Sequence, residues 1–237
     1  MATRLQAVRA QLSAAARAAG RNEDSVTLVA VSKGQPARAV RQLARLGVSD
    51  FGESYLQEAL PKVRELEALE LTWHFIGRLQ ANKTRAVAES FSWVHSLDRL
   101  QLAQRLAAQR PHWAAPLNVC LQVKPGHDPG KGGVAMAHAA PLADSLRALP
   151  RLRLRGLMCM LPDDLGADEQ LRQFRSVHAL MSTLNAAGHG LDTLSMGMSG
   201  DFPLAIQAGA TLVRIGTALF GARPAPRRNP GAPPPSP

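Results

Sequence analysis

The feature that most constrains the fold of this chain is a regular alternation of short apolar runs with longer amphipathic stretches. The runs are rich in β-branched residues and predict strands, whereas the stretches between them have helical periodicity. The predicted strands cover residues 27–31, 48–52, 71–76, 92–97, 116–123, 152–160, 193–196 and 211–215. The predicted helices cover residues 36–46, 54–68, 82–89, 98–109, 134–149, 167–187, 202–208 and 217–220, and Asp98 stands where it can cap the fourth.

Eight strands that alternate with eight helices in about 200 residues are typical of an α/β protein with a single (β/α)8 TIM-type barrel. The alternative is an open doubly wound sheet, but no G-x-G-x-x-G segment follows the first strand, as a dinucleotide-binding fold would require. A barrel carries its functional residues at the carboxyl ends of the strands. It commonly binds a phosphate near the seventh and eighth strands.

The two ends of the chain differ from this pattern. Residues 1–20 predict an extra N-terminal helix, in which Leu5, Val8, Leu12, Ala15 and Ala19 form an apolar stripe and Gly20 follows the last turn. Their Arg- and Ala-rich composition also suits a mitochondrial transit peptide, but the stripe favours a helix that docks on the domain. Residues 224–237 are rich in Pro and Arg and predict a disordered tail. We therefore divide the chain into a barrel over 1–223 and a tail over 224–237.

Composition excludes several classes of protein. With 46% apolar residues, the chain is neither disordered nor a collagen, and no apolar run reaches the ~18–20 residues of a membrane span. Two cysteines form neither a disulfide framework nor a four-ligand zinc site, and they suit the cytoplasm. The net charge of +10 comes from scattered basic residues. Such a charge suits an anionic small ligand, whereas a nucleic-acid binder more often shows a basic stripe.

Lys33 follows the first predicted strand, in the segment Val31-Ser-Lys33-Gly. Burial of a lysine lowers its pKa, and a neutral amine is the species that attacks a carbonyl to form a Schiff base. The alternative is a lysine that forms an ion pair or reaches solvent and does no chemistry.

Glycines and hydroxyls follow the last two predicted strands. Ser199 lies in the segment Ser195-Met-Gly-Met-Ser-Gly-Asp201, and Gly216 and Thr217 end the segment Val213-Arg-Ile-Gly-Thr217. Backbone amides at such turns bind phosphate, although two capped turns without a ligand would look the same. A phosphate site opposite a strand-end lysine is a stronger signal than either feature alone.

Seven segments together resemble the pyridoxal phosphate homeostasis protein family, whose fold resembles the barrel domain of alanine racemase. The resemblance runs in the family's order from the first helix to about residue 223. It is carried by the segments AVSK (30–33), FGESY (51–55), WHFIG (73–77), LQANK (79–83), LRGLM (154–158), LSMGMS (194–199) and VRIGT (213–217).

The resemblance implies specific roles for the strand-end residues. Lys33 matches the lysine that holds pyridoxal 5′-phosphate as an internal aldimine, and Ser199 with Gly216 and Thr217 matches the phosphate site. Arg214 matches the arginine that faces the pyridine nitrogen. Because an arginine stays protonated, it disfavours a second positive charge on the ring, which makes the ring a weaker electron sink.

Three further positions are implied near the cofactor. Ser54 stands where the family usually has an asparagine, so a shorter side chain would donate to the ring hydroxyl. His74 and Asn82 match family positions near the site, although a capping or core role suits them as well. No catalytic residue and no metal ligand is implied.

The function implied by the resemblance is a protein that holds pyridoxal 5′-phosphate for intracellular homeostasis or delivery, without robust turnover. Its expected partners are the cofactor and pyridoxal phosphate-dependent apo-enzymes, with no nucleic acid and no membrane, and we expect a monomer. The first alternative is an amino-acid racemase, which needs a second acid or base. Tyr55 is the sole tyrosine, and only 20 residues follow Thr217. The second alternative, a sugar-phosphate lyase, predicts a lysine late in the barrel.

Overall fold

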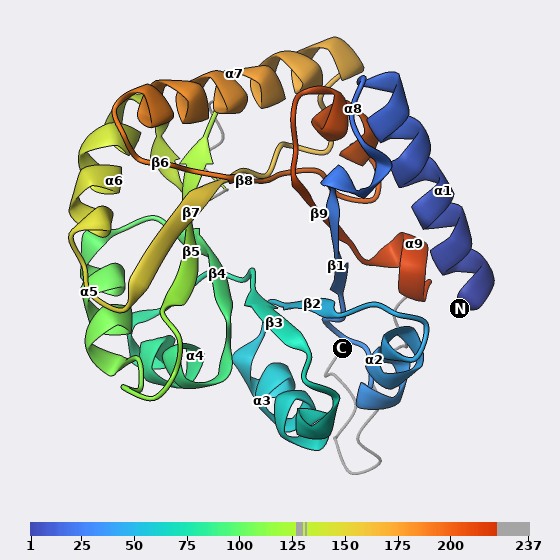
Figure 1. Ribbon diagram of the computed structural model, residues 1–237, viewed down its shortest axis with the longest axis horizontal. Coiled ribbons are helices and arrows are strands. Elements are labelled where there is room, and N and C mark those ends of the chain that lie inside the picture. The colour runs from blue at the N-terminus through green and yellow to red at the C-terminus, as the bar shows by residue number, and fades with distance from the viewer. Residues whose placement is uncertain (127–129, 131, 222–237) are drawn as a thin grey trace, which may run out of the picture.

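The computed structural model describes residues 1–126, 130 and 132–221, and a closed ring of parallel strands forms its centre (Figure 1). The strands neighbour one another in the order β4-β3-β2-β1-β9-β8-β7-β5, and a pairing between β4 and β5 closes the ring. This arrangement confirms the predicted TIM-type barrel. The ring consists of β1 (Thr27–Val31), β2 (Asp50–Glu53), β3 (Thr72–Phe75), β4 (Trp93–Leu97), β5 (Leu117–Lys124), β7 (Leu152–Met158), β8 (Thr193–Ser195) and β9 (Leu212–Ile215).

One short strand lies outside the ring and was not predicted. β6 (Val134–Ala135) pairs in parallel with Val123 and Lys124 at the end of β5. It occupies the first two residues of the helix predicted over 134–149, which instead begins as α6 at Ala139. Two residues are too few to produce a periodic signal in the sequence.

Helices surround the ring close to the predicted positions, within a few residues at each end. They are α1 (Ala2–Ala18), α2 (Ala37–Ala44), α3 (Leu56–Glu65), α4 (Thr84–Ser90), α5 (Leu100–Gln109), α6 (Ala139–Arg147), α7 (Ala167–Ala186), α8 (Phe202–Gln207) and α9 (Thr217–Phe220). Single turns of 3₁₀ helix occupy η1 (Glu23–Ser25), η2 (Glu67–Leu69), η3 (Ala81–Lys83) and η4 (Met136–His138). The predicted cap of α5 is wrong, because Arg99 is its N-cap residue and Asp98 accepts a hydrogen bond from the Arg99 side chain instead.

α1 lies on the outside of the barrel, along α8 and α9 (Figure 1). Its buried stripe consists of Leu5, Val8, Leu12 and Ala16, so Ala16 takes the place predicted for Ala15 and Ala19. The intervals of three and four residues keep this stripe on one face. α1 is therefore packed as part of the domain. The predicted tail over 224–237 lies outside the described residues.

The interior of the barrel is polar at mid-height. Neighbouring side chains of a strand point to opposite faces, so one set points to the surrounding helices and the other into the ring. Phe51 and Trp73 pack together in the outer layer, with ring centroids 5.9 Å apart. His74, His95, Ser195 and Arg214 are buried and contact one another across the ring, because β3 and β4 face β8 and β9.

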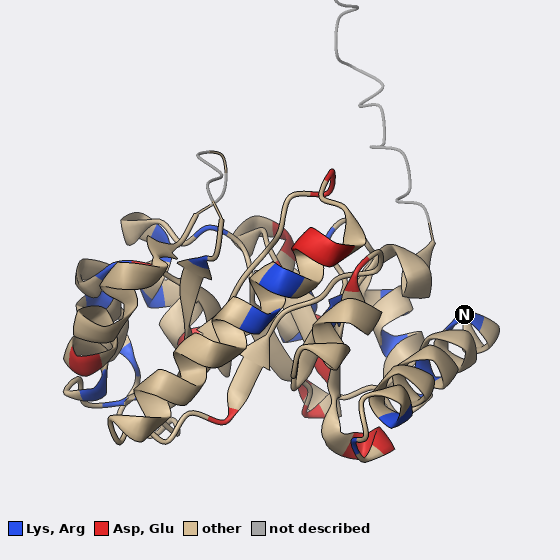
Figure 2. Cartoon of the chain, turned by 90° about the horizontal axis from the view of Figure 1, so that it is seen from above, with Lys and Arg blue, Asp and Glu red and all other residues tan. Residues whose placement is uncertain are grey.

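Charged residues are distributed around the outside of the fold. Figure 2 shows Lys and Arg spread over several of the surrounding helices rather than gathered on one element. Across residues 1–126, 130 and 132–221, none of the helices combines the length and the apolar character that crossing a bilayer requires.

Candidate cofactor site

A cavity of about 510 Å³ lies at the carboxyl ends of the barrel strands, a volume suited to a small cofactor. Six of the eight predicted site residues line it: Lys33, Ser54, Ser199, Arg214, Gly216 and Thr217. They come from the ends of β1, β2, β8 and β9, as expected for a site in this fold. Side chains not predicted from the sequence also line the cavity: Val31, Ile76, Met160, Pro162, Asp163, Gln170, Met198 and Asp201.

Lys33 is half-buried two residues beyond the end of β1, and α3 holds the backbone on both sides of it. The Lys62 ammonium donates a hydrogen bond to the Ser32 carbonyl over 2.8 Å. The Gly34 amide donates to Glu58 Oε2, also over 2.8 Å. Because Glu58 and Lys62 are four residues apart on one helix, a single rigid element fixes the backbone that carries Lys33.

Lys62 also forms a buried ion pair behind Lys33. Its Nζ lies 2.7 Å from Glu53 Oε1, and the side chains are 8% and 0% exposed. Ser32 Oγ donates to the same carboxylate oxygen over 2.6 Å. Burial raises the pKa of Glu53 above its ordinary value, although Lys62 and Ser32 act in the opposite direction. Sequence reasoning missed this pair, because the i, i+4 spacing indicates only the contact of Lys62 with Glu58.

The turn that follows β8 is shaped to expose backbone amides. Gly197 has a φ of +95°, and a Cβ there would lie 2.9 Å from Phe202 Cα, so the position requires glycine. The Asp201 carboxylate accepts a hydrogen bond from the Met198 amide and fixes the turn. In the described part of the chain, the amides of Ser199 and Gly200 donate no hydrogen bond.

These amides, the Ser199 hydroxyl and the start of α9 at Thr217 fit an anionic group. All of them lie at one side of the cavity, after β8 and β9. Free amides and helix starts are the groups that bind phosphate in proteins. The cavity is therefore chemically suited to a phosphate at this side and to a carbonyl carbon near Lys33.

Arg214 is 3% exposed and closes the bottom of the cavity. Its Nη1 donates to Ser195 Oγ over 2.7 Å, and its Nη2 donates to the Cys159 carbonyl over 2.9 Å. Burial lowers the pKa of Arg214 from its ordinary value, which still leaves a guanidinium charged at neutral pH. These two anchors fix the plane of a group that can only donate hydrogen bonds.

The structure does not bring the other two predicted residues into the cavity. His74 is buried in the middle of β3 and forms hydrogen bonds with Asp50 and His95, so it has the core role that the sequence also allowed. Asn82 is exposed in η3. Ile76, which follows β3, contributes to the cavity lining instead.

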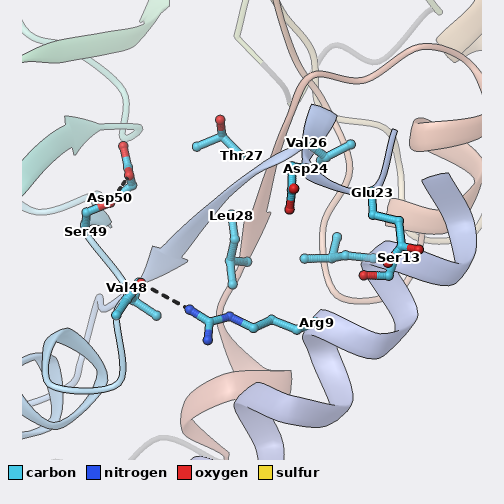
Figure 3. Close-up of a pocket in the computed structure, with 12 residues that line it drawn as sticks. Arg9, Ser13, Glu23, Asp24, Val26, Thr27, Leu28, Val48, Ser49 and Asp50 are labelled. Atoms are coloured by element: carbon cyan, nitrogen blue, oxygen red, sulfur yellow. Dashed lines mark hydrogen bonds between the residues drawn. The ribbon is translucent and has the colours of Figure 1, made fainter. Parts of the chain in front are cut away.

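Two further cavities open at the amino ends of the strands. One, of about 330 Å³, lies between α1 and the barrel (Figure 3). Arg9 crosses it from α1 and donates to the Gly47 carbonyl over 3.1 Å. The other has a volume of about 360 Å³ and is lined by His74, Trp93 and Arg155 among others. Asp50 lines both cavities.

Comparison with known proteins gives a consistent result for sequence and structure. The model of the family described as alanine racemase, N-terminal domain, matches residues 3–224. A pyridoxal phosphate homeostasis protein of Pseudomonas aeruginosa is 52% identical over 223 residues, which cover 94% of this chain and 96% of that protein. One of Escherichia coli is 45% identical over 229 residues, covering 94% and 97%.

Solved structures agree with these relatives. The structure of PipY of Synechococcus elongatus with pyridoxal phosphate bound superposes with a TM-score of 0.82 at 40% identity, covering 93% of this chain and 99% of that one. The structure of PipY without the cofactor gives a TM-score of 0.84 at 41% identity and covers 93% and 100%. Alanine racemase of Corynebacterium glutamicum, at 20% identity and a TM-score of 0.65, shares the fold; the match covers 93% of this chain and 62% of that one.

Proposed function

The chain belongs to the pyridoxal phosphate homeostasis protein family, and we propose that it binds pyridoxal 5′-phosphate for intracellular homeostasis or delivery. One observation carries the proposal: an amine, a guanidinium and a set of free amides and hydroxyls surround a single cavity of about 510 Å³. Binding of the same cofactor by the related PipY supports it. The cofactor supplies an aldehyde that condenses with an amine and a ring that accepts electrons.

Each cavity residue has a distinct task in this proposal. Lys33 offers its Nζ as the amine that forms a covalent bond to the cofactor, and α3 holds its backbone in place. Ser199 with the Gly216–Thr217 backbone binds the phosphate. Ser54 is half-buried at the end of β2 and donates to the ring hydroxyl.

Arg214 determines which chemistry the bound ring can support. A guanidinium only donates hydrogen bonds, so it favours an unprotonated ring nitrogen and weakens the ring as an electron sink. Two acidic residues line the cavity, Asp201 and Asp163. The Asp201 carboxylate accepts a hydrogen bond from the Met198 amide, and Asp163 is exposed. Tyr55 is 55% exposed and does not belong to the lining. This arrangement supports holding the cofactor rather than moving protons on an amino acid.

We further propose that the protein is a monomer, that it acts in the cytoplasm and that it passes the cofactor to apo-enzymes. Cys120 and Cys159 are both free and buried, which suits a reducing compartment. An amino-acid racemase is the competing function. The two differ in turnover, because a racemase exchanges the α-proton of its substrate at every cycle.

The experiment incubates the cofactor-loaded protein with L-alanine in deuterated water and follows α-proton exchange by NMR. The proposal predicts cofactor binding in a prior absorbance titration, followed by exchange far below the ~1–10³ s⁻¹ of typical enzymes. Exchange within that range would establish a racemase. Failure to bind the cofactor at all would refute the proposal.

A further inference from the structure

A continuous chain of hydrogen bonds crosses the barrel interior from the cofactor cavity to the opposite end. Arg214 Nη1 lies 2.7 Å from Ser195 Oγ, which lies 2.7 Å from His95 Nδ1. His95 Nε2 lies 2.9 Å from His74 Nδ1, and His74 Nε2 lies 2.9 Å from Asp50 Oδ1. Five strands contribute one side chain each, namely β9, β8, β4, β3 and β2.

The two ends of this chain have opposite hydrogen-bonding capacity. The Arg214 guanidinium can only donate, and an ionised Asp50 carboxylate can only accept. Burial raises the pKa of Asp50, but hydrogen bonds from His74 and Ser49 outweigh it, so that the net pKa lies below the ordinary value. The carboxylate is therefore the acceptor end at neutral pH.

The two histidines between these ends are neutral. His74 is 1% exposed and His95 is 0% exposed. Burial lowers the pKa of His74, although Asp50 raises it in part. Burial, with a further contribution from the charge of Arg214, lowers the pKa of His95 well below its ordinary value. Each ring consequently carries one proton and can donate from only one nitrogen.

Only one order of protons satisfies all four contacts. The reverse order would place a proton on Nδ1 of each ring, and the bare Nε2 of His74 would then face the Asp50 carboxylate, acceptor against acceptor. In the reverse order, both His95 and Arg214 would also donate to Ser195 Oγ. The hydroxyl proton of Ser195 would then have no acceptor among the five residues of this hydrogen-bond network. Both effects disfavour the reverse order, because an unmade hydrogen bond in a buried site is costly.

We propose that Asp50, at the opposite end of the barrel, is a positioning residue for Arg214, because its carboxylate holds His74 and His95 as Nε2–H tautomers. With that order, Ser195 donates to His95 and presents its lone pairs to Arg214 alone. The guanidinium then donates to Ser195 Oγ and to the Cys159 carbonyl, and its remaining N–H groups can donate to a ligand in the cavity. The role assigned to Arg214 rests on the proposed function, whereas the order of protons does not.

The first test measures the ring-nitrogen shifts of His74 and His95 by ¹⁵N NMR on the ligand-free protein. The expected result is a protonated Nε2 and an unprotonated Nδ1 in both rings. A proton on Nδ1 of either ring would overturn the proposal, whether or not the protein binds a cofactor. This measurement therefore separates the order of protons from the proposed function.

The second test compares Asp50→Ala with Asp192→Ala. Asp192 lines the same cavity as Asp50 but pairs with Arg155, outside the chain of hydrogen bonds. Asp50→Ala should mix the tautomers of His74 and His95 and weaken pyridoxal phosphate binding roughly threefold to tenfold, the scale of one hydrogen bond. Asp192→Ala should leave both properties unchanged. A folded Asp50→Ala protein with unchanged tautomers and affinity would overturn the proposal.

A third variant keeps the test decisive if Asp50→Ala does not fold. Ser195→Ala removes the acceptor of Arg214 Nη1 and leaves the contact between His74 and Asp50 in place. Ser195→Ala should weaken pyridoxal phosphate binding to a similar extent, while His74 stays protonated at Nε2. Unchanged affinity in Ser195→Ala would contradict the positioning of Arg214. Failure of the unmodified protein to bind the cofactor would refute the proposed function, and the NMR result would still decide the order of protons.

Discussion

Replacing Lys62 by methionine tests how the backbone around Lys33 is stabilised. Methionine keeps most of the side-chain volume but removes the ammonium group, which lies 2.7 Å from Glu53 and 2.8 Å from the Ser32 carbonyl. The Glu53 side chain is 0% exposed, so water cannot replace the lost cation. Breaking a buried ion pair in this way costs about 3–5 kcal/mol of unfolding free energy. For a domain of this size the melting temperature should fall by roughly 6–20 °C.

The stability lost in Lys62→Met should depend on pH in a direction that follows from the pKa of Glu53. Burial raises the pKa of Glu53 in the folded protein, so its contribution to stability is present below its unfolded pKa and is lost as the pH rises through the folded pKa. Without Lys62, the folded pKa of Glu53 rises further. The stability difference between Lys62→Met and the unmodified protein should therefore be largest near neutral pH and narrow toward about pH 5.

The assay is urea unfolding of both proteins at the two pH values, with two matched controls. Arg41→Met removes one partner of the exposed pair Arg41–Glu65 and should cost at most about 1 kcal/mol. The double variant Lys62→Met with Glu53→Leu removes both buried charges and should regain most of the stability. If Lys62→Met is as stable as Arg41→Met, or its deficit grows on acidification, the reasoning is refuted.

Two further predictions concern the phosphate side of the cavity and the thiols. Ser199→Ala should weaken the binding of pyridoxal 5′-phosphate roughly tenfold to a hundredfold, which corresponds to the loss of one hydrogen bond to a charged group. In a parallel titration, the affinity for unphosphorylated pyridoxal should stay nearly unchanged. Equal losses for both ligands would make Ser199 a structural residue. Burial raises the pKa of Cys120 and of Cys159 to about 12, so iodoacetamide should alkylate neither thiol of the folded protein at neutral pH, as checked by mass spectrometry. Labelling before unfolding would contradict the burial of the thiols.

The barrel was predictable because its signals are local. The run Thr27–Val31 was bounded correctly, since β-branched residues followed by polar ones mark the strand and its end. The glycines after β8 and β9 identified the two turns of the cavity, and the φ of +95° at Gly197 is a conformation that favours glycine. Lys33 stood out as a lysine at the end of an apolar strand. These observations located Lys33 and the two phosphate-side turns of the cavity.

The parts that could not be predicted depend on partners distant in the sequence. His74 was placed near the site by its motif, but its side chain points into the barrel at mid-height. There it contacts Asp50 of β2 and His95 of β4, and His95 in turn contacts Ser195 of β8 across the closed ring. The pairing of Glu53 with Lys62 depends on how α3 packs on β2. Which neighbour a buried polar side chain meets is set by strand register and helix packing, and neither appears in local periodicity.

The proposed function requires Lys33 to be the residue that binds the cofactor covalently. The direct measurement is to incubate the protein with pyridoxal 5′-phosphate, reduce it with borohydride and locate the added mass by peptide mass spectrometry. We predict the modification on the peptide that contains Lys33, and none in a Lys33→Ala protein with an unchanged circular dichroism spectrum. Modification of another lysine, such as Lys62, or an undiminished yield in Lys33→Ala, would contradict it.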